Sequence, residues 1–229
     1  MVTQQFVLDL AQPEPPSFDN FVAGSNAEPI AALTALAAGT SRENGILLWG
    51  APGAGKTHLL RATAARAGAT RPIVECSTRA DIGAATIPDA ALVVVDAIDS
   101  ADALAQGRLF TLLNEVPTRG GQWLAAASVP PASLPLRDDL RTRVALGLVF
   151  EIVALSDADK SRALAAYARE RGFRLSDDVI GYLLAHGRRD MPTLVATLAA
   201  LDRHSLATRR PITVALLRDW LQKDPRLAR

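Results

Sequence analysis

GAPGAGKT, residues 50–57, is the stretch that decides the fold of this 229-residue chain. It fits the pattern G-x-x-x-x-G-K-[ST] between an apolar run and a helical pattern, which is the context that a phosphate-binding loop requires. Its glycines, Gly50, Gly53 and Gly55, let backbone N–H groups converge on phosphate oxygens. The helix that follows directs its positive N-terminal end at the same anion. The stretch therefore predicts a nucleotide-binding loop between a strand and a helix.

Two side chains at the end of the loop carry the expected chemistry. Lys56 supplies a compact charge for the terminal phosphates, and the hydroxyl of Thr57 is an expected Mg²⁺ ligand. Only three of the 25 basic residues are lysine, so a lysine here indicates a chemical requirement, because the planar fork of arginine does not thread such a loop. Pro52 and Ala54 complete the predicted nucleotide contacts of the loop. The competing interpretation is a glycine-rich turn before a structural helix.

Further polar side chains follow two other apolar strands. Asp96 ends a β-branched run, and we expect its carboxylate in the Mg²⁺ shell. Ala97 stands where ATPases of this broad class usually place an acid, and a methyl group cannot accept a proton. Asp99 is near in sequence but need not face the same way, so we expect nucleotide binding with weak intrinsic hydrolysis. Ser128 is either a sensor of the γ-phosphate or an ordinary turn residue.

Apolar runs alternate with helical patterns over the first two thirds of the chain. This alternation predicts an α/β fold, with a parallel sheet and helices on both faces. Expected strands are 46–49, 72–76, 92–95, 123–127 and 148–153, and expected helices are 30–36, 57–67 and 101–116. After residue 155 the strands stop, and N-cap candidates Ser156, Ser176, Asp190 and Thr213 predict about four helices. The predicted parts are an extended arm (1–16), a nucleotide-binding core (17–155) and a small all-α domain (156–229).

Composition excludes several classes of protein. A formal net charge of +1 argues against binding nucleic acid through bulk electrostatics. The single cysteine, Cys76, excludes an intramolecular disulfide and a four-cysteine zinc site and fits a reducing compartment. The start of the chain has no basic region followed by an apolar core, and no run of about 18 apolar residues exists. We therefore expect no secretory signal, no membrane contact and a cytoplasmic location.

Several segments carry a family resemblance. They are Phe18-Asp19-Asn20-Phe21-Val22, the GKTHLL ending of the loop, Pro130-Pro131 with Leu134, and Gly172-Phe173 with residues 176–179. Together they resemble the ATPase core and lid of the bacterial replication initiator DnaA over residues 17–222. DnaA continues into a helix-turn-helix domain that reads origin DNA, and we expect none here. What remains resembles Hda, the DnaA relative that promotes regulatory inactivation of the initiator. The resemblance implies an AAA+ P-loop core, a helical lid, ADP or ATP with Mg²⁺, and a nucleotide site that includes Val22 and His58.

The arm fits a sliding-clamp peptide of the kind that Hda proteins carry. Such a peptide begins with Gln and has apolar residues at its fourth and sixth places, which from Gln5 are Leu8 and Leu10. Counting from Gln4 puts valine and aspartate there and fits worse. An extended segment offers the Gln amide as donor and acceptor while its leucines fill an apolar pocket. The alternative is that these residues pack on their own domain or have no fixed structure.

The resemblance also implies an arginine finger that acts in trans. The segment Asp139–Val144 aligns with the family's finger segment and places the finger at Arg143, with Arg141 as the neighbouring alternative. A guanidinium delivered to a partner's γ-phosphate stabilises transition-state charge. A second sensor arginine of the family's lid is replaced here by Pro192. Arg188 and Arg189 are the candidates to substitute for it.

The resulting hypothesis is a negative regulator of DNA replication initiation. A nucleotide-bound adaptor would dock on the DNA polymerase sliding clamp (the β subunit) and contact DNA only through it. Arg143 would then stimulate hydrolysis of the ATP bound to DnaA. The alternatives are an autonomous AAA+ ATPase such as a helicase loader, and a P-loop kinase of small molecules. The sequence is also compatible with a homo-oligomer.

Overall fold

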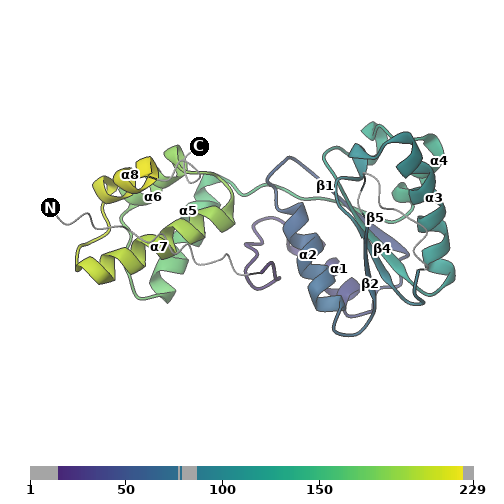
Figure 1. Cartoon of the computed structure of the whole chain (residues 1–229), viewed down its shortest axis with the longest axis horizontal. Helices are drawn as coiled ribbons and strands as arrows, with labels where there is room; N and C mark the ends of the chain where they lie inside the picture. Colours follow the sequence, from purple (N-terminus) through teal and green to yellow (C-terminus); the bar gives the residue numbers. More distant parts are fainter. Residues whose placement is uncertain (1–14, 77, 79–86, 224–229) are drawn as a thin grey trace. The chain divides into compact units, whose positions relative to one another are not determined.

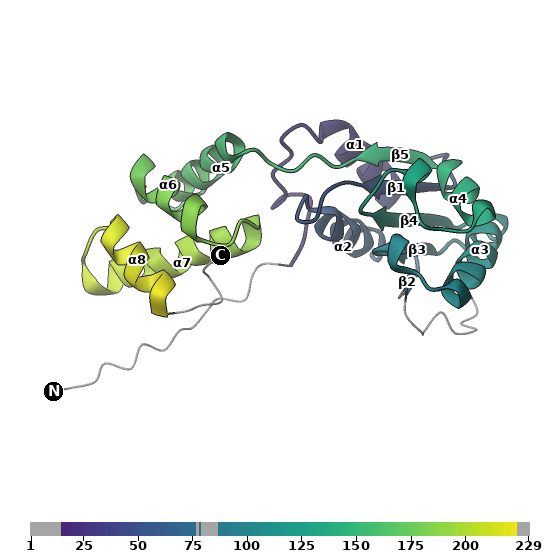
Figure 2. The ribbon, with the colours of Figure 1, turned by 90° about the horizontal axis from the view of Figure 1, so that it is seen from above.

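The computed structural model describes residues 15–76, 78 and 87–223. Its chain divides into two compact units, Pro15–Ala154 and the part from Leu155 onward, which Figures 1 and 2 show from two directions. The first is an α/β unit and the second consists of helices, so the predicted α/β core and all-α domain are confirmed as fold classes. Within the described residues, no helix is long and apolar enough to cross a membrane.

Five parallel strands form the sheet of the α/β unit. In chain order they are β1 (Gly45–Trp49), β2 (Ile73–Cys76), β3 (Leu92–Val95), β4 (Gln122–Ala127) and β5 (Leu148–Glu151). Their order across the sheet is β2-β3-β4-β1-β5, and each neighbouring pair is parallel. Because the strands are parallel, the carboxyl ends of β3, β4 and β1 lie side by side at one edge.

Helices cover both faces of this sheet, as Figure 2 shows. Alternate residues of a strand face opposite sides, so Ile46 and Leu48 of β1 join one apolar cluster and Leu47 joins the other. The first cluster packs against α1 (Ala27–Ala37) and α2 (Lys56–Ala67). The second packs against α3 (Ala103–Thr118) and α4 (Asp138–Ala145). Near-continuous apolar strands are typical of a sheet that is buried on both faces.

Trp123 is the largest fully buried side chain of the unit, and it packs against glycine backbone. A Cβ built on Gly45 would lie 2.1 Å from the Trp123 ring. A Cβ on Gly147 would lie 2.6 Å from the Gly45 carbonyl and 2.7 Å from the same ring. Leu146 and Gly147 are the two residues between α4 and β5. The packing of Gly147 on Trp123 therefore fixes where α4 ends and β5 begins.

Besides shifts of one to three residues at the ends of other helices and strands, two features of the unit differ from the sequence prediction. Residues 138–145 form the helix α4, whereas the sequence pattern marks them only as an arginine-bearing segment. Strand β5 ends at Glu151, two residues before the predicted end. Asn26 explains this, because its side chain accepts from Val153 N–H (2.8 Å) and donates to Val153 C=O (2.9 Å). The N–H and C=O groups of Val153, which would continue the β-ladder, are thus bound by Asn26 instead.

Four helices make up the described part of the second unit: α5 (Asp157–Glu170), α6 (Asp177–His186), α7 (Met191–Thr208) and α8 (Val214–Lys223). The predicted caps are present. Ser156 and Asp159 form a capping box, and Ser176 and Asp190 accept the N–H groups of Val179 and Thr193. Leucines of all four helices form the unit's own apolar cluster.

Candidate nucleotide site and finger helix

The polar residues predicted from three separate strands lie at one edge of the sheet. The phosphate loop follows β1, Asp96 follows β3, and Ser128 follows β4. These strands are neighbours in the sheet, so parallel topology alone brings their carboxyl ends together. This edge is where open α/β sheets bind ligands.

The loop has a backbone that only glycine fits at two positions. Gly50 has φ of 151°, and a Cβ there would lie 2.4 Å from the carbonyl oxygen of Ile152. Gly55, directly before α2, has φ of 102°, and its Cβ would lie 2.7 Å from the Phe21 ring. The loop therefore passes close to the end of β5 on one side and to the 17–22 segment on the other. This close packing holds its N–H groups in place for an anion.

Lys56 lies against the start of the loop. Its Nζ donates to the carbonyl oxygens of Gly50 (2.6 Å) and Ala51 (3.0 Å). Burial lowers the pKa of Lys56, while the negative charges of Asp96 and Asp99 act in the opposite direction. The ammonium is thus bound by the start of the loop, where a charge for the terminal phosphates is expected.

Thr57 and Asp96 meet across the site. The Thr57 hydroxyl donates to Asp96 Oδ2 at 2.6 Å, so both oxygens can reach one ion. Hydroxyl and carboxylate oxygens are ligands that Mg²⁺ accepts, and Mg²⁺ takes few protein ligands when phosphates supply the others. The pair therefore fits the predicted Mg²⁺ ligands. Among the described residues, no group of three or more His, Cys, Asp or Glu side chains could hold a metal by itself.

Asp99 is the functional candidate that sequence reasoning left undecided. Its carboxylate accepts the N–H of Ser128 (3.0 Å) and the hydroxyl of Ser128. Its charge also acts to raise the pKa of Lys56, and Ser128 follows β4, which neighbours β1 and the loop, so Asp99 lies at the edge of the sheet that carries the loop. The sensor candidate Ser128 therefore already binds a carboxylate from the turn that follows the neighbouring strand β3.

The backbone at Ala97 directs Asp99 to this position. Ala97 has φ of 49° and ψ of 49°, in the left-handed region, and it begins the short 3₁₀ turn Ile98–Ser100. The Ser100 hydroxyl donates to the Ala97 carbonyl (2.8 Å) and pairs with the Thr78 hydroxyl (2.8 Å). A left-handed alanine is uncommon, and these contacts hold it. The sequence pattern gives no signal that predicts this turn.

The segment that carries much of the family resemblance lies on the start of α2. His58 Nε2 is 2.9 Å from the Ser17 carbonyl, and the rings of Phe21 and His58 have centroids 5.4 Å apart. Phe21 also covers Gly55. Val22 follows directly and is half-buried. Val22 is thus on a segment that contacts the phosphate loop, and His58, in the first turn of α2, binds the same segment.

A pocket opens next to the predicted Mg²⁺ ligands. Thr57 and Asp96 line it together with Leu60, Arg61, Glu75, Cys76 and Val94. Cys76 is half-buried at the end of β2, and burial raises the pKa of its thiol. It therefore behaves as a protonated, largely apolar wall of the pocket.

The predicted finger Arg143 lies on α4 and is half-buried. Its Nε and Nη2 donate to the carbonyl oxygen of Leu113 in α3, at 3.3 and 3.1 Å. Arg141, the alternative, donates to Asp138 on its own helix at 2.7 Å. The two arginines thus differ: one is held by a neighbouring helix, and the other forms a local ion pair.

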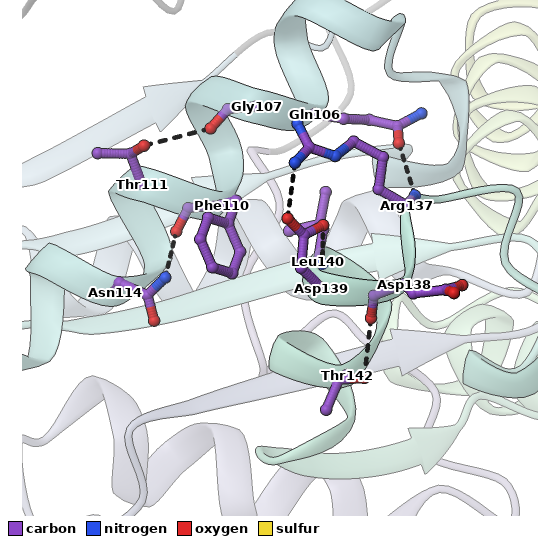
Figure 3. A network of polar contacts seen from close by, with 10 residues as sticks. All are labelled: Gln106, Gly107, Phe110, Thr111, Asn114, Arg137, Asp138, Asp139, Leu140 and Thr142. Atoms are coloured by element: carbon purple, nitrogen blue, oxygen red, sulfur yellow. Dashed lines mark hydrogen bonds and ion pairs between the residues drawn. The ribbon is translucent and has the colours of Figure 1, made fainter.

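Figure 3 shows how α3 and α4 are joined. The N–H of Arg137, the residue before α4, donates to Gln106 Oε1 of α3 at 2.8 Å. The guanidinium of Arg137 pairs with Asp139 at 2.7 Å. Leu140 and Val144 are fully buried against the sheet. The helix that carries Arg143 is therefore fixed at its start and along its buried face.

The predicted clamp-binding residues Gln5, Leu8 and Leu10 lie outside the described residues. Pro192 is in the first turn of α7, and the candidates to replace a sensor arginine there are both ion-paired within the helical unit. Arg188 Nε lies 3.1 Å from Asp190, and Arg189 pairs with Asp157.

Family models match two parts of the chain. Residues 157–221 match the model described as "Hda, lid domain". Residues 14–76 match the model described as "Bacterial DnaA ATPAse domain". The first match spans the helical unit, and the second contains the phosphate loop.

Solved structures share the fold at low identity. Domain III of the replication initiation protein DnaA from Thermotoga maritima is 18% identical with a TM-score of 0.73, covering 92% of this chain and 97% of that one. AMPPCP-bound DnaA from Aquifex aeolicus is 21% identical with a TM-score of 0.65, covering 86% and 70%. The Holliday junction branch migration motor RuvB of Thermotoga maritima is 19% identical with a TM-score of 0.65, covering 93% and 74%.

Proposed function

Because this chain belongs to the Hda family of DnaA-related AAA+ proteins, we propose that it is a negative regulator of replication initiation. In this proposal ADP or ATP, with Mg²⁺, binds at the phosphate loop and organises the protein. The arm docks on the sliding clamp, and Arg143 stimulates hydrolysis of the ATP bound to DnaA. The observation that carries the proposal is the Hda lid match following a DnaA-like ATPase domain.

The site supports a regulatory use of the nucleotide. The loop, Lys56, Thr57 and Asp96 supply what phosphate and Mg²⁺ binding need. The residue after Asp96 is Ala97, which cannot act as a general base. Binding without efficient hydrolysis suits a protein whose nucleotide serves to set its conformation.

Arg143 supports action on a partner. Arg143 lies on α4, far in sequence from the phosphate loop, and its guanidinium is held on the Leu113 carbonyl. A trans-acting arginine contributes about 10³–10⁵ in rate in other NTPases. We therefore assign the catalytic role in trans to Arg143 and keep Arg141 as its matched comparison.

The test is hydrolysis of DnaA-bound ATP in the presence of clamp-loaded, primed DNA. Arg143→Ala should abolish the stimulation, and Arg141→Ala, which loses only the ion pair with Asp138, should retain it. Wild-type stimulation by Arg143→Ala would overturn the finger assignment. Clamp binding that is unchanged by Gln5→Ala with Leu8→Ala would remove the arm from the mechanism.

An autonomous ATPase is the second candidate, and Asp99 favours it. Its carboxylate reaches Ser128 beside the loop and offers a proton acceptor that Ala97 lacks. This candidate predicts turnover by the isolated protein near the ordinary enzyme range of about 1–10³ s⁻¹. Turnover far below that range, with intact stimulation of DnaA, would exclude it.

A further inference from the structure

Helix α3 contains a proline one turn after a buried leucine. Pro117 lies within α3, and proline has no N–H to donate to the carbonyl of the residue four positions before it. That residue is Leu113, which is 0% exposed. A buried carbonyl needs a hydrogen-bond partner. The sequence of α3 therefore creates a buried carbonyl that lacks its usual donor, the N–H four positions later.

Arg143 supplies the missing donors. Both contacts from its guanidinium, from Nε at 3.3 Å and from Nη2 at 3.1 Å, go to this same oxygen of Leu113. The helix α4 that carries Arg143 is fixed against α3 by the Gln106–Arg137 hydrogen bond seen in Figure 3. The arginine is thus held at both ends, by its helix at Cα and by Leu113 at the guanidinium.

This anchoring uses only one edge of the guanidinium. An arginine side chain has five N–H donors in a fixed plane. The Leu113 carbonyl takes the Nε–H and one Nη2–H, which leaves three donors, two on Nη1 and one on Nη2. Those three form the end of the fork that matches a phosphate group in a bidentate way.

We propose that Pro117 is a positioning residue for Arg143: it frees the Leu113 carbonyl, which orients the guanidinium so that its Nη1–Nη2 end meets the γ-phosphate of the partner's nucleotide. This inference rests on the proposed function, because it assumes that Arg143 is the finger. An arginine ordered before the partner binds needs no further ordering in the transition state. Pro117 acts through Arg143 and touches no nucleotide itself.

Pro117→Ala tests the proposal, because alanine restores the N–H that Leu113 lacks. The Leu113 carbonyl should return to the helix, and Arg143 should lose its anchor. We expect stimulated hydrolysis of DnaA-bound ATP to fall about 10- to 100-fold, the scale of a small misplacement of a catalytic group. The thermal midpoint of the α/β unit should not fall, since alanine favours a helix interior over proline.

Two comparisons make the result specific. Pro29→Ala changes a proline in the first turn of α1, where an N–H has no intrahelical partner, and should leave stimulation unchanged. Arg143→Lys keeps the charge but lacks the edge that grips Leu113, and should lose stimulation at least as strongly as Pro117→Ala. The Arg143 Nε–H signal in ¹⁵N NMR should be protected from exchange in the wild type and exposed in Pro117→Ala.

The outcomes separate this inference from the proposed function. Wild-type stimulation by Arg143→Ala would refute the finger assignment, and with it this inference. Loss of stimulation in Arg143→Ala, with full stimulation in Pro117→Ala or Arg143→Lys, refutes the positioning role alone. An exchange rate of the Arg143 Nε–H that does not change in Pro117→Ala also refutes the positioning role and leaves the finger intact.

Discussion

The contact between Arg143 and Leu113 should be measurable as a coupling energy between positions 117 and 143. Arg143→Ala in the wild-type background removes both guanidinium donors from a buried carbonyl that lacks the N–H of residue 117. Leaving such a group unsatisfied costs about 1–3 kcal/mol. In the Pro117→Ala background the carbonyl has an N–H from residue 117, so the same change should cost little. We expect a coupling of about 1–2 kcal/mol between the two changes, less than the full penalty because the carbonyl relaxes toward water.

Urea unfolding of the four proteins of this cycle measures the coupling. The chain has three tryptophans, of which Trp220 belongs to the helical unit and Trp49 and Trp123 to the α/β unit. A Trp220→Phe background therefore makes fluorescence report on the α/β unit alone. Equal m-values across the cycle would show that the unfolding reaction is the same in each variant.

The matched cycle uses Arg141, which lies on the same helix but pairs with Asp138. Arg141→Ala and Pro117→Ala have no shared partner, so their effects should add within about 0.5 kcal/mol. If the Arg143 cycle were equally additive, the carbonyl would not depend on Arg143, and the reasoning from Pro117 would be refuted.

Three further predictions concern the nucleotide site and the helical unit. Lys56→Arg should weaken binding of a fluorescent nucleotide by at least about tenfold, nearly as much as Lys56→Ala, because a planar fork replaces a compact ammonium; wild-type affinity of the arginine variant would contradict this. Asp99→Asn removes a negative charge bound to Ser128 and should raise the ATP-over-ADP affinity ratio about 5- to 30-fold, or about 1–2 kcal/mol; competition binding that gives an unchanged ratio would exclude the charge effect. Hydrogen bonds from the Ser156 side chain and N–H hold the pKa of Asp159 below its usual value, so its stabilising contribution is complete above about pH 4 and is lost as the pH falls through the lower pKa of the folded state. Ser156→Ala should make the thermal midpoint of the helical unit less pH-dependent between about pH 2 and 5, and an equal slope in both proteins would argue against the capping box as the cause.

Much of the fold follows from local sequence patterns. The apolar runs at 46–49, 92–95 and 123–127 are strands β1, β3 and β4, with only one added residue at the start of β1 and of β4. The caps at Ser156, Ser176 and Asp190 begin helices as predicted. These signals succeed because burial periodicity and capping depend on neighbours in sequence.

The remaining features depend on contacts between distant residues. Strand β5 stops early because Asn26, 127 positions before Val153, takes its backbone groups. Asp99 faces the site only because Ala97 adopts a left-handed conformation. A proline at position 117 of a helical pattern implies that the Leu113 carbonyl lacks its usual N–H donor. The local sequence does not predict that Arg143 binds this carbonyl instead.

The stack of Gly45, Trp123 and Gly147 has an evolutionary consequence. The nearest atoms that a side chain at position 45 would meet all belong to the indole, whereas one at position 147 would also strike the Gly45 carbonyl. Homologues with a smaller residue in place of Trp123 should therefore accept alanine at position 45 while keeping glycine at position 147. Substitutions at 45 and 123 should accordingly arise together across lineages, and position 147 should stay constant through both.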